Sequence, residues 1–335
     1  MPTPSHHCEF PLRDLARRLV VPALGVGLAA LLLRFAAVFD LLPAPTPRDL
    51  DRTILAAKVE LAASDRPAEV VLLGDSSCMM NVNATGLGRL VDRPVLNLGT
   101  FSHLGPANHA ELFRRFLRDR RTPPRDVLLL LHPGSLRRSS GEPEAERFLK
   151  ARLEGRLADG ATAPRSLVEA CLGGVFVRER LVQPLLPQLL SGDFATAYGT
   201  TWRVRRRLET GAGSLVDPTR FDASALGGRY EFGVGAGVEP AFREFRSAIP
   251  PNVRLWVGLM PTPESLALPD HATRVRELRQ ALVGWLAPSR PLESVPAAWP
   301  DSRFATATHL NAGGVQELTG QLGGELASAL LLEPR

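Results

Sequence analysis

The sequence predicts an α/β protein whose parallel sheet is covered by helices on both faces, with an N-terminal transmembrane helix and a mainly helical insertion. Three observations predict this class. Four short apolar runs are nearly continuous, which is typical of parallel strands that are buried on both faces. Stretches with helical periodicity separate these runs, and one long apolar segment lies near the N-terminus. The predicted strands are Glu69–Leu73, Pro94–Leu98, Asp126–Leu131 and Val253–Leu259.

The long apolar segment, Leu19–Phe39, contains a single charge, Arg34. As a helix that rises about 1.5 Å per residue it is about 31 Å long, enough to cross the hydrocarbon of a bilayer. Arginines precede it and Asp40 follows it, so the positive-inside rule keeps residues 1–18 in the cytoplasm and exports the rest. A cleaved signal peptide and a buried helix are the alternatives. The length and the lack of a small-x-small site favour an uncleaved signal anchor in a bacterial cytoplasmic membrane.

Residues 40–67 are predicted to form a linker and a juxtamembrane helix, because the Pro-rich run Leu41–Thr46 precedes helical periodicity over Arg48–Ala63. The α/β domain is predicted over residues 68–335. Within it, residues 139–248 hold no strand of similar quality and are interpreted as an insertion near the mouth of the site. The helices predicted around the strands are Thr85–Leu90, Pro106–Asp119, Thr273–Leu286 and Gly313–Leu331, and those in the insertion are Arg147–Leu157 and Leu167–Leu190.

The composition excludes several classes of function. The chain has 40 Lys+Arg against 35 Asp+Glu, and only Lys58 and Lys150 are lysines. It carries no basic stripe on a recognisable module, so we expect no nucleic-acid partner. It has no Walker A loop, no GxGxxG after a strand and no metal-ligand spacing, so we expect neither a cofactor nor a metal. Cys78 and Cys171 form either one disulfide or two buried thiols.

Candidate residues for acyl chemistry stand at strand ends and before the last helix. The first predicted strand ends in Gly74-Asp75-Ser76, and in parallel sheets ligands bind at the carboxyl ends of the strands. A serine there exposes its hydroxyl beside backbone N–H groups that stabilise an oxyanion. Gly99, after the second strand, is a candidate for a second N–H donor, and His309 is the candidate general base. The alternative for Ser76 is a turn serine that caps the following helix.

These motifs resemble those of the SGNH (GDSL-type) hydrolase superfamily. The matching segments are the GDS of Gly74–Ser76, the glycine block Asn97–Gly99 and the HLN…G of His309–Gly313. The resemblance is closest to its membrane-anchored branch, the D-alanyl-lipoteichoic acid biosynthesis protein and alginate O-acetyltransferase types. It implies a three-layer flavodoxin-like sandwich, Ser76 as nucleophile and His309 as base. It further implies that Asp75 fixes the turn, and that the N–H groups of Ser76 and of the Asn97–Gly99 block line an oxyanion hole.

Two positions depart from the pattern of that family. The family usually has an Asp three residues before the histidine, where this chain has Thr306. Asp301, eight residues before His309, is the candidate orienting acid if the loop folds back, and a Ser–His dyad without an acid is the alternative. The third strand is followed by His132-Pro133-Gly134 and lacks the family's Asn, so either His132 donates to the oxyanion from the cleft or the hole has two donors.

The predicted function is a membrane-anchored, extracytoplasmic serine esterase or O-acyltransferase that acts on cell-envelope polysaccharide through an acyl-Ser76 intermediate. The expected partners are a cell-surface glycan or other acylated polymer, the membrane and, by analogy with the family, a membrane-bound acyl-donor protein. Asn311 is a further candidate for the cleft, and the basic cluster Trp202–Arg207 is either a solvated face or a contact for an anionic glycan. Because Thr306 replaces the acid, a catalytically inactive scaffold or glycan-binding subunit is the alternative.

Overall fold

The computed structural model of the 335-residue chain describes residues 50–155, 203–216 and 232–331, together with positions 18–22, 24, 25, 28 and 32. The chain divides into two compact units. One comprises Met1–Thr46 and Ala161–Phe194, and the other comprises Pro47–Gly160 and Ala195–Arg335. All the described strands and the candidate site belong to the second unit.

A five-stranded parallel sheet with the strand order β2-β1-β3-β4-β6 forms the centre of the second unit. This confirms the predicted α/β class with a parallel sheet. The four predicted strands are present, and the end of each is shifted by a single residue at most. The sequence does not predict β6, because its two residues form no apolar run. The strands are β1 (Val70–Gly74), β2 (Val95–Asn97), β3 (Asp126–Leu131), β4 (Arg254–Leu259) and β6 (Arg290–Pro291).

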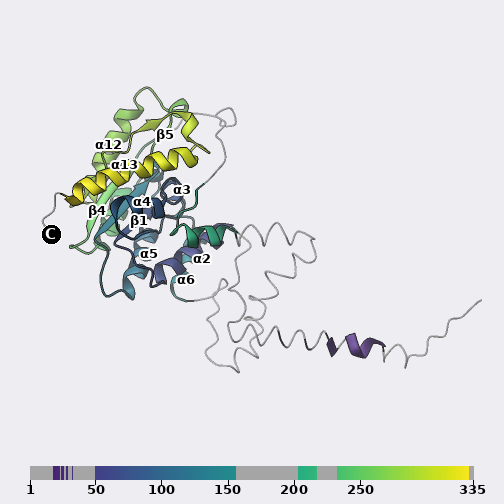
Figure 1. The fold of residues 1–335 in the computed structure, drawn as a ribbon. Helices are drawn as coiled ribbons and strands as arrows, with labels where there is room; N and C mark the ends of the chain where they lie inside the picture. Colours follow the sequence, from purple (N-terminus) through teal and green to yellow (C-terminus); the bar gives the residue numbers. More distant parts are fainter. Residues whose placement is uncertain are drawn as a thin grey trace, which may run out of the picture. The chain divides into compact units, whose positions relative to one another are not determined.

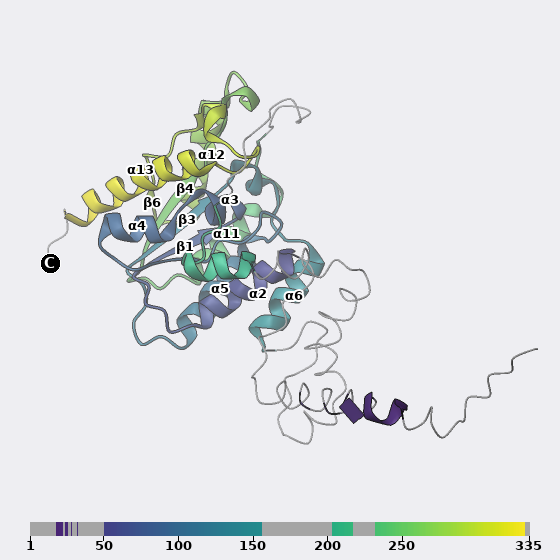
Figure 2. The ribbon, with the colours of Figure 1, turned by 45° about the vertical axis from the view of Figure 1, so that its right-hand side comes forward.

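Helices cover both faces of this sheet, as Figure 1 and Figure 2 show. One face carries α2 (Leu50–Ala63), α5 (Pro106–Arg118), α6 (Pro143–Leu153), α11 (Val238–Ser247) and α12 (His271–Trp285). The other carries α3 (Ser76–Asn81), α4 (Ala84–Val91) and α13 (Ala312–Leu331), the last drawn in yellow. Short elements complete the fold: β5 (Thr262–Pro263) pairs with β7 (Ala298–Trp299), and the 3₁₀ turns are η1 (Pro133–Arg137), η4 (Glu264–Leu266) and η5 (Asp301–Arg303).

The strands send alternate side chains into two separate cores, because successive residues of a strand point to opposite faces. In β1, Val71 and Leu73 belong to the core under α2, α5, α11 and α12, whereas Val70 and Leu72 belong to the core under α4 and α13. All five residues of β1 are buried. This double burial explains why apolar runs without alternation identify the strands in the sequence.

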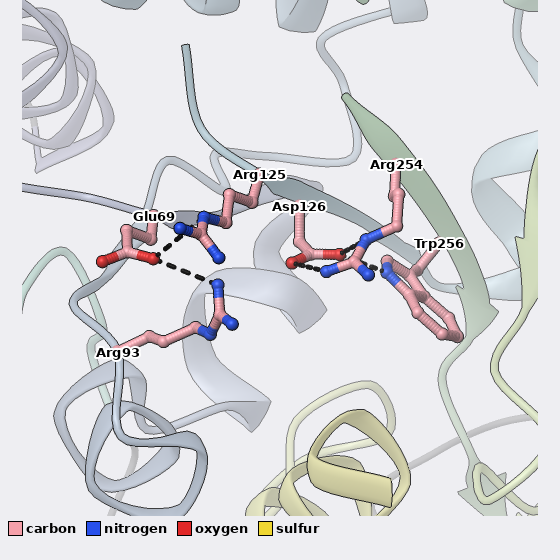
Figure 3. Close-up of polar contacts among 6 residues, drawn as sticks. All are labelled: Glu69, Arg93, Arg125, Asp126, Arg254 and Trp256. Atoms are coloured by element: carbon pink, nitrogen blue, oxygen red, sulfur yellow. Dashed lines mark hydrogen bonds and ion pairs between the residues drawn. The ribbon is translucent and has the colours of Figure 1, made fainter. Parts of the chain in front are cut away.

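A buried carboxylate at the start of β3 links this strand to β4 (Figure 3). Asp126 accepts two hydrogen bonds of 2.7 Å from the Arg254 guanidinium and one of 2.8 Å from Trp256 Nε1. Asp126 also pairs with Arg254 in the sheet register. Nearby, Glu69 lies between Arg93 and Arg125. These contacts lie at the amino ends of the strands, so they stabilise the register of the sheet away from the carboxyl ends where the candidate site lies.

The described ends of the stretch predicted as an insertion pack within the α/β unit. At its start, α6 packs against α2 and α5, and at its end, α11 packs against α5 and α12. Between them, residues 211–216 contact β2 and α3, since Ala212 O accepts from Asn97 N at 2.8 Å and Leu215 N donates to Met79 O at 3.0 Å. These parts of the 139–248 stretch therefore belong to the layers of the α/β unit. The predicted helix Leu167–Leu190 lies outside the described residues.

The predicted anchor Leu19–Phe39 lies mostly outside the described residues. Among the residues that the structure does describe, no helix combines the length and the apolarity needed to cross a membrane. Cys78 is a free, buried thiol whose pKa is raised by its burial. Cys171, the other cysteine of the two alternatives, lies outside the described residues.

Lys58 of α2 is fully buried and joins three segments of the fold. Its Nζ donates to Asn97 O at 2.9 Å and to Gly213 O at 2.6 Å. Burial lowers the pKa of Lys58 to about 7, because the charged amine loses its hydration, and nearby Cys78 offsets this effect in part. Helix α2, the end of β2 and residues 211–216 are therefore held together by one amine.

The depressed pKa of Lys58 predicts a pH-dependent stability. Between pH 7 and about 10 the unfolded lysine, with a pKa of about 10.4, binds a proton that the folded one has lost. The free energy of unfolding therefore rises with pH in this window, by up to about 1.4 kcal/mol per pH unit. In Lys58→Met this component is absent, which urea titrations across the window would measure. Lys150→Met, at an exposed position of α6, is the control, and parallel stability curves for wild type and Lys58→Met would contradict the prediction.

Candidate active site

The turn after β1 is held in a conformation that requires glycine. Gly74 has φ +143°, and a Cβ at this position would lie 1.8 Å from the carbonyl oxygen of Leu130 in β3. Its own carbonyl oxygen accepts from Thr100 N at 2.9 Å. The close approach of β1 and β3 directs the chain out of the sheet, so the next residues begin helix α3 at the carboxyl edge.

Asp75 is the residue that organises this edge. Its Oδ1 accepts from Ser77 N at 2.9 Å and from Ser77 Oγ at 2.5 Å, which caps α3. Its Oδ2 accepts from His132 N at 2.7 Å and from Ser135 Oγ at 2.5 Å. The side chain thus joins the turn after β1 to the turn after β3, a fixing role that the resemblance implies for the first of these turns. Because Asp75 provides the cap, the alternative in which Ser76 caps α3 does not match the structure.

Ser76 and His309 meet at the carboxyl edge of the sheet. The distance between Ser76 Oγ and His309 Nε2 is 3.0 Å, within hydrogen-bond reach. In the tautomer that carries its proton on Nδ1, the serine hydroxyl donates to Nε2. Ser76 is half-buried at the start of α3, and it lines a cleft of about 490 Å³. The residues that the sequence predicts as nucleophile and base, Ser76 and His309, are thus adjacent.

The loop that carries His309 is held by its own backbone and by Thr306. Ala305 N and Thr306 N donate to His309 O at 2.8 and 3.1 Å. The Thr306 hydroxyl accepts from His309 N at 3.1 Å and from Thr308 N at 3.3 Å. The residue at the position of the family's Asp therefore closes a turn around the histidine backbone.

Asn81, at the end of α3, clamps the same loop from the other side. Its Oδ1 accepts from Leu310 N at 2.8 Å, and its Nδ2 donates to Thr308 O at 3.2 Å. The side chain is fully buried. Because Ser76 and Asn81 lie at the two ends of one short helix, α3 both presents the serine and positions the histidine. Sequence reasoning missed Asn81, since no local pattern pairs it with residues near position 309.

We expect Asn81→Ala to lower kcat about tenfold or more and the free energy of unfolding by about 2 kcal/mol. The buried Leu310 N–H would lose its acceptor, and the histidine loop would lose its alignment with Ser76. Asn83→Ala is a matched control, because Asn83 caps α4 by accepting from Gly86 N at 2.9 Å. It should lower stability by about 1 kcal/mol and leave kcat unchanged. Equal kcat values for both variants would contradict a positioning role of Asn81. Assays of ester hydrolysis, the activity that the sequence predicts, measure kcat, and urea titrations measure the free energy of unfolding.

The structure differs from the expectation for Gly99 and Asn97. The Gly99 N–H donates to Asn97 Oδ1 at 2.9 Å, so its hydrogen is already engaged and the expected oxyanion contact is not formed. Asn97 Nδ2 donates to Cys78 O at 2.9 Å and to Ser214 Oγ at 3.2 Å. The side chain of Asn97 therefore holds α3 and residue 214 against β2. Neither residue lines the cleft.

Asp301 and Asn311 also differ from expectation. The Asp301 carboxylate accepts from Ser265 N at 3.1 Å, so it stabilises the η4 turn instead of folding back to orient the imidazole. Asn311 Oδ1 accepts from Gly314 N at 3.1 Å, and its Nδ2 donates to Ser302 O at 2.8 Å. Asn311 therefore caps the start of α13, and it does not line the cleft.

His132 lies on the wall of the cleft, as expected. Burial lowers the pKa of its imidazole to about 4; Asp75 opposes this shift, and His309 and His271 add to it. The ring is therefore neutral at pH 7. Its Nδ1 accepts from Gly134 N at 3.1 Å, which puts the proton of the neutral ring on Nε2. Within residues 50–155, 203–216 and 232–331, no group of three His, Cys, Asp or Glu side chains forms a metal-binding cluster.

The assembled site contains a hydroxyl within reach of an imidazole, at the carboxyl edge of a parallel sheet and at the point where the strand order reverses around β1. Such an arrangement can activate an oxygen nucleophile for acyl transfer. Comparisons with protein-family models, with curated proteins and with solved structures find no match.

Proposed function

We propose that the protein is a serine esterase or O-acyltransferase that acts on acylated cell-envelope polysaccharide. The observation that carries the proposal is the 3.0 Å distance between Ser76 Oγ and His309 Nε2 in a cleft at the carboxyl edge of the sheet. Because a serine hydroxyl is weakly nucleophilic on its own, it needs an adjacent base of this kind. Asp75 supports the arrangement by fixing the backbone on both sides of the cleft.

In the proposed reaction Ser76 Oγ attacks the carbonyl carbon of an ester while His309 Nε2 takes the hydroxyl proton. The tetrahedral intermediate collapses, the bond to the alcohol oxygen breaks, and the alcohol leaves with the proton from His309. Water or a sugar hydroxyl then gives its proton to His309 and attacks the acyl carbon. The bond to Ser76 Oγ breaks, His309 returns the proton to that oxygen, and an acid or a new ester is released. The Ser76 N–H is the backbone donor that we assign to the oxyanion.

The strand order supports the resemblance to the SGNH hydrolase superfamily. The order β2-β1-β3-β4-β6 corresponds to the flavodoxin-like arrangement 2-1-3-4-5, in which the ligand crevice lies at the switch between β1 and β3. The cleft beside Ser76 is lined from the segments that follow β1, β2 and β3. These features are what the GDS and HLN motifs lead us to expect for a member of this superfamily.

We further propose that the α/β unit lies outside a bacterial cytoplasmic membrane, anchored by Leu19–Phe39. The described residues within this segment support the anchor, because large apolar side chains there are solvent-exposed: Leu19 by 57%, Val21 by 74% and Leu24 by 68%. A lipid environment would cover them. A membrane-bound acyl-donor protein would then supply acyl groups on the same side of the membrane.

A catalytically inactive scaffold or glycan-binding subunit is the second candidate. The observation that favours it concerns two positions: Thr306, which replaces the family's Asp, and Asp301, the candidate orienting acid. The side chains at both positions bond backbone N–H groups. Thr306 Oγ1 accepts from the His309 backbone, and the Asp301 carboxylate accepts from Ser265 N. Covalent chemistry at Ser76 distinguishes the two candidates.

The proposal is tested by reacting the full-length protein with an alkyl fluorophosphonate and mapping the adduct by peptide mass spectrometry. An activated serine displaces fluoride and retains the phosphonyl group, so we expect one adduct on Ser76. Protein unfolded in urea is the control, because it loses the Ser76–His309 pair and should remain unlabelled. A native protein that forms no adduct, or forms it on another serine, would favour the inactive scaffold.

A further inference from the structure

Two arginines supply the charge of the described part of the cleft beside Ser76. The lining residues are Ser76, Ser102, Thr308 and members of the turn His132–Arg138, including Arg137 and Arg138. Among the residues that the structure describes, no acidic side chain lines the cleft. His132 is neutral at pH 7, because burial lowers its pKa to about 4. The cleft therefore carries a positive charge that arginine keeps at any working pH.

Both guanidinium groups are available to a ligand. Arg137 and Arg138 are solvent-exposed, and neither side chain forms a hydrogen bond or ion pair with any residue in the described part of the chain. Some other arginines of this unit do have partners. Arg205 of the basic cluster, for example, is bonded to Glu60 at 2.7 Å and to Glu209 at 3.0 Å.

The backbone that carries these arginines is fixed relative to Ser76. Asp75 immediately precedes Ser76, and its Oδ2 accepts from His132 N and Ser135 Oγ in the turn that leads to Arg137. On the far side, Gly235 N donates to Leu136 O at 2.9 Å. A Cβ at Gly235 would lie 2.1 Å from Arg137 O, so this segment packs tightly on the turn. The distance from nucleophile to arginine backbone is thus set by the fold.

We propose that Arg137 and Arg138 form a subsite for a carboxylate or phosphate group that lies beside the reacting ester. The substrate class is therefore an anionic acyl ester, in which a fixed negative charge accompanies the scissile bond. Guanidinium groups bind such oxyanions in paired hydrogen bonds, which orients as well as attracts the substrate. This inference rests on the proposed function, since it takes Ser76 as the nucleophile.

Matched model esters test the subsite with the full-length protein. 3-Acetoxybenzoate carries a carboxylate, 3-acetoxyphenyl phosphate carries a phosphate, and 3-acetoxybenzamide is a neutral analogue of the first. We expect wild type to prefer an anionic ester over the amide by about tenfold in kcat/KM, because each exposed ion pair contributes only a few-fold. The double variant R137Q/R138Q should lose this preference, through a fall in kcat/KM for the anionic ester. Whichever anion is preferred identifies the group that the subsite recognises.

The control is Arg207→Gln, which removes an exposed arginine that does not line the cleft and should keep the preference. Added salt should reduce the preference of wild type. Equal turnover of charged and neutral esters by wild type, or a preference that survives in R137Q/R138Q, would overturn the subsite while leaving Ser76 as nucleophile. A wild-type protein with neither turnover nor a fluorophosphonate adduct would overturn the proposed function and the subsite with it.

Discussion

Ser76→Ala is expected to lower the kcat/KM for acetyl-ester hydrolysis by roughly 10³-fold or more and to abolish fluorophosphonate labelling. The substitution removes the oxygen of the proposed acyl-enzyme bond, and His309 Nε2 loses its contact with Ser76 Oγ at 3.0 Å. Any residual turnover would come from water that the imidazole activates directly. Hydrolysis of 3-acetoxybenzamide by the full-length protein provides the measurement, and the label provides a second readout.

The fold should tolerate Ser76→Ala, because Asp75 and not Ser76 caps α3. We expect the free energy of unfolding to change by less than about 1 kcal/mol. Ser328→Ala is the matched control, since the Ser328 hydroxyl donates to Gly324 O within α13, far along the chain from the pair. Its activity should equal that of wild type. A Ser76→Ala protein with unchanged ester turnover would show that another group carries the reaction.

Gly74→Ala is expected to have the largest effect on stability, a loss of more than about 3 kcal/mol in the free energy of unfolding. Two causes act together. The backbone at φ +143° is strained for any residue with a Cβ, and that Cβ would lie 1.8 Å from Leu130 O. Relief requires β1 and β3 to move apart, which breaks the pairing at the centre of the sheet.

Urea titration of the full-length protein measures the loss, with Gly320→Ala as control. Gly320 lies inside α13 with open space at the position of its Cβ, so alanine there should stabilise the helix by about 0.5 to 1 kcal/mol. If Gly74→Ala lowers the free energy of unfolding and Gly320→Ala raises it, the loss at Gly74 comes from the strained turn and not from a general effect of replacing glycine. A Gly74→Ala protein as stable as wild type would contradict the close approach of β1 and β3.

The elements with strong local patterns could be predicted from the sequence. Two strands, Val70–Gly74 and Asp126–Leu131, are buried on both faces, so each is an unbroken apolar run in the sequence. The predicted bounds of these strands therefore lie close to the observed ones. Helix α5 could be predicted because its apolar residues recur on one buried face and Pro106 stands in its first turn. Strand β6 lacks such a pattern, because its two residues join the edge of the sheet through backbone pairing with β4.

The Ser76–His309 pair could be proposed from motifs, because both residues stand where the chain leaves or approaches the carboxyl edge of the sheet. The contacts that hold the pair could not be predicted from the sequence, because they join residues that are far apart in it. Asn81 bonds residues near position 309, and Asp75 bonds the turn after β3. Side-chain oxygens that accept hydrogen bonds from backbone N–H groups give no periodic signal in a sequence. For the same reason the sequence predicts roles for Asp301 and Gly99 that differ from their contacts in the structure.

The different exposure of the two lysines allows the local separation of α2 from β2 to be measured. Lys150 is exposed on α6, whereas Lys58 is fully buried with its amine on two carbonyl oxygens. An amine-acylating reagent should therefore modify Lys150 at once and reach Lys58 only when α2 separates from β2. The reaction at Lys58 would then proceed at a rate set by the free energy of that opening. Mass spectrometry of the two lysine peptides would measure how firmly α2, the helix that follows the proposed anchor, is held to β2 within the α/β unit.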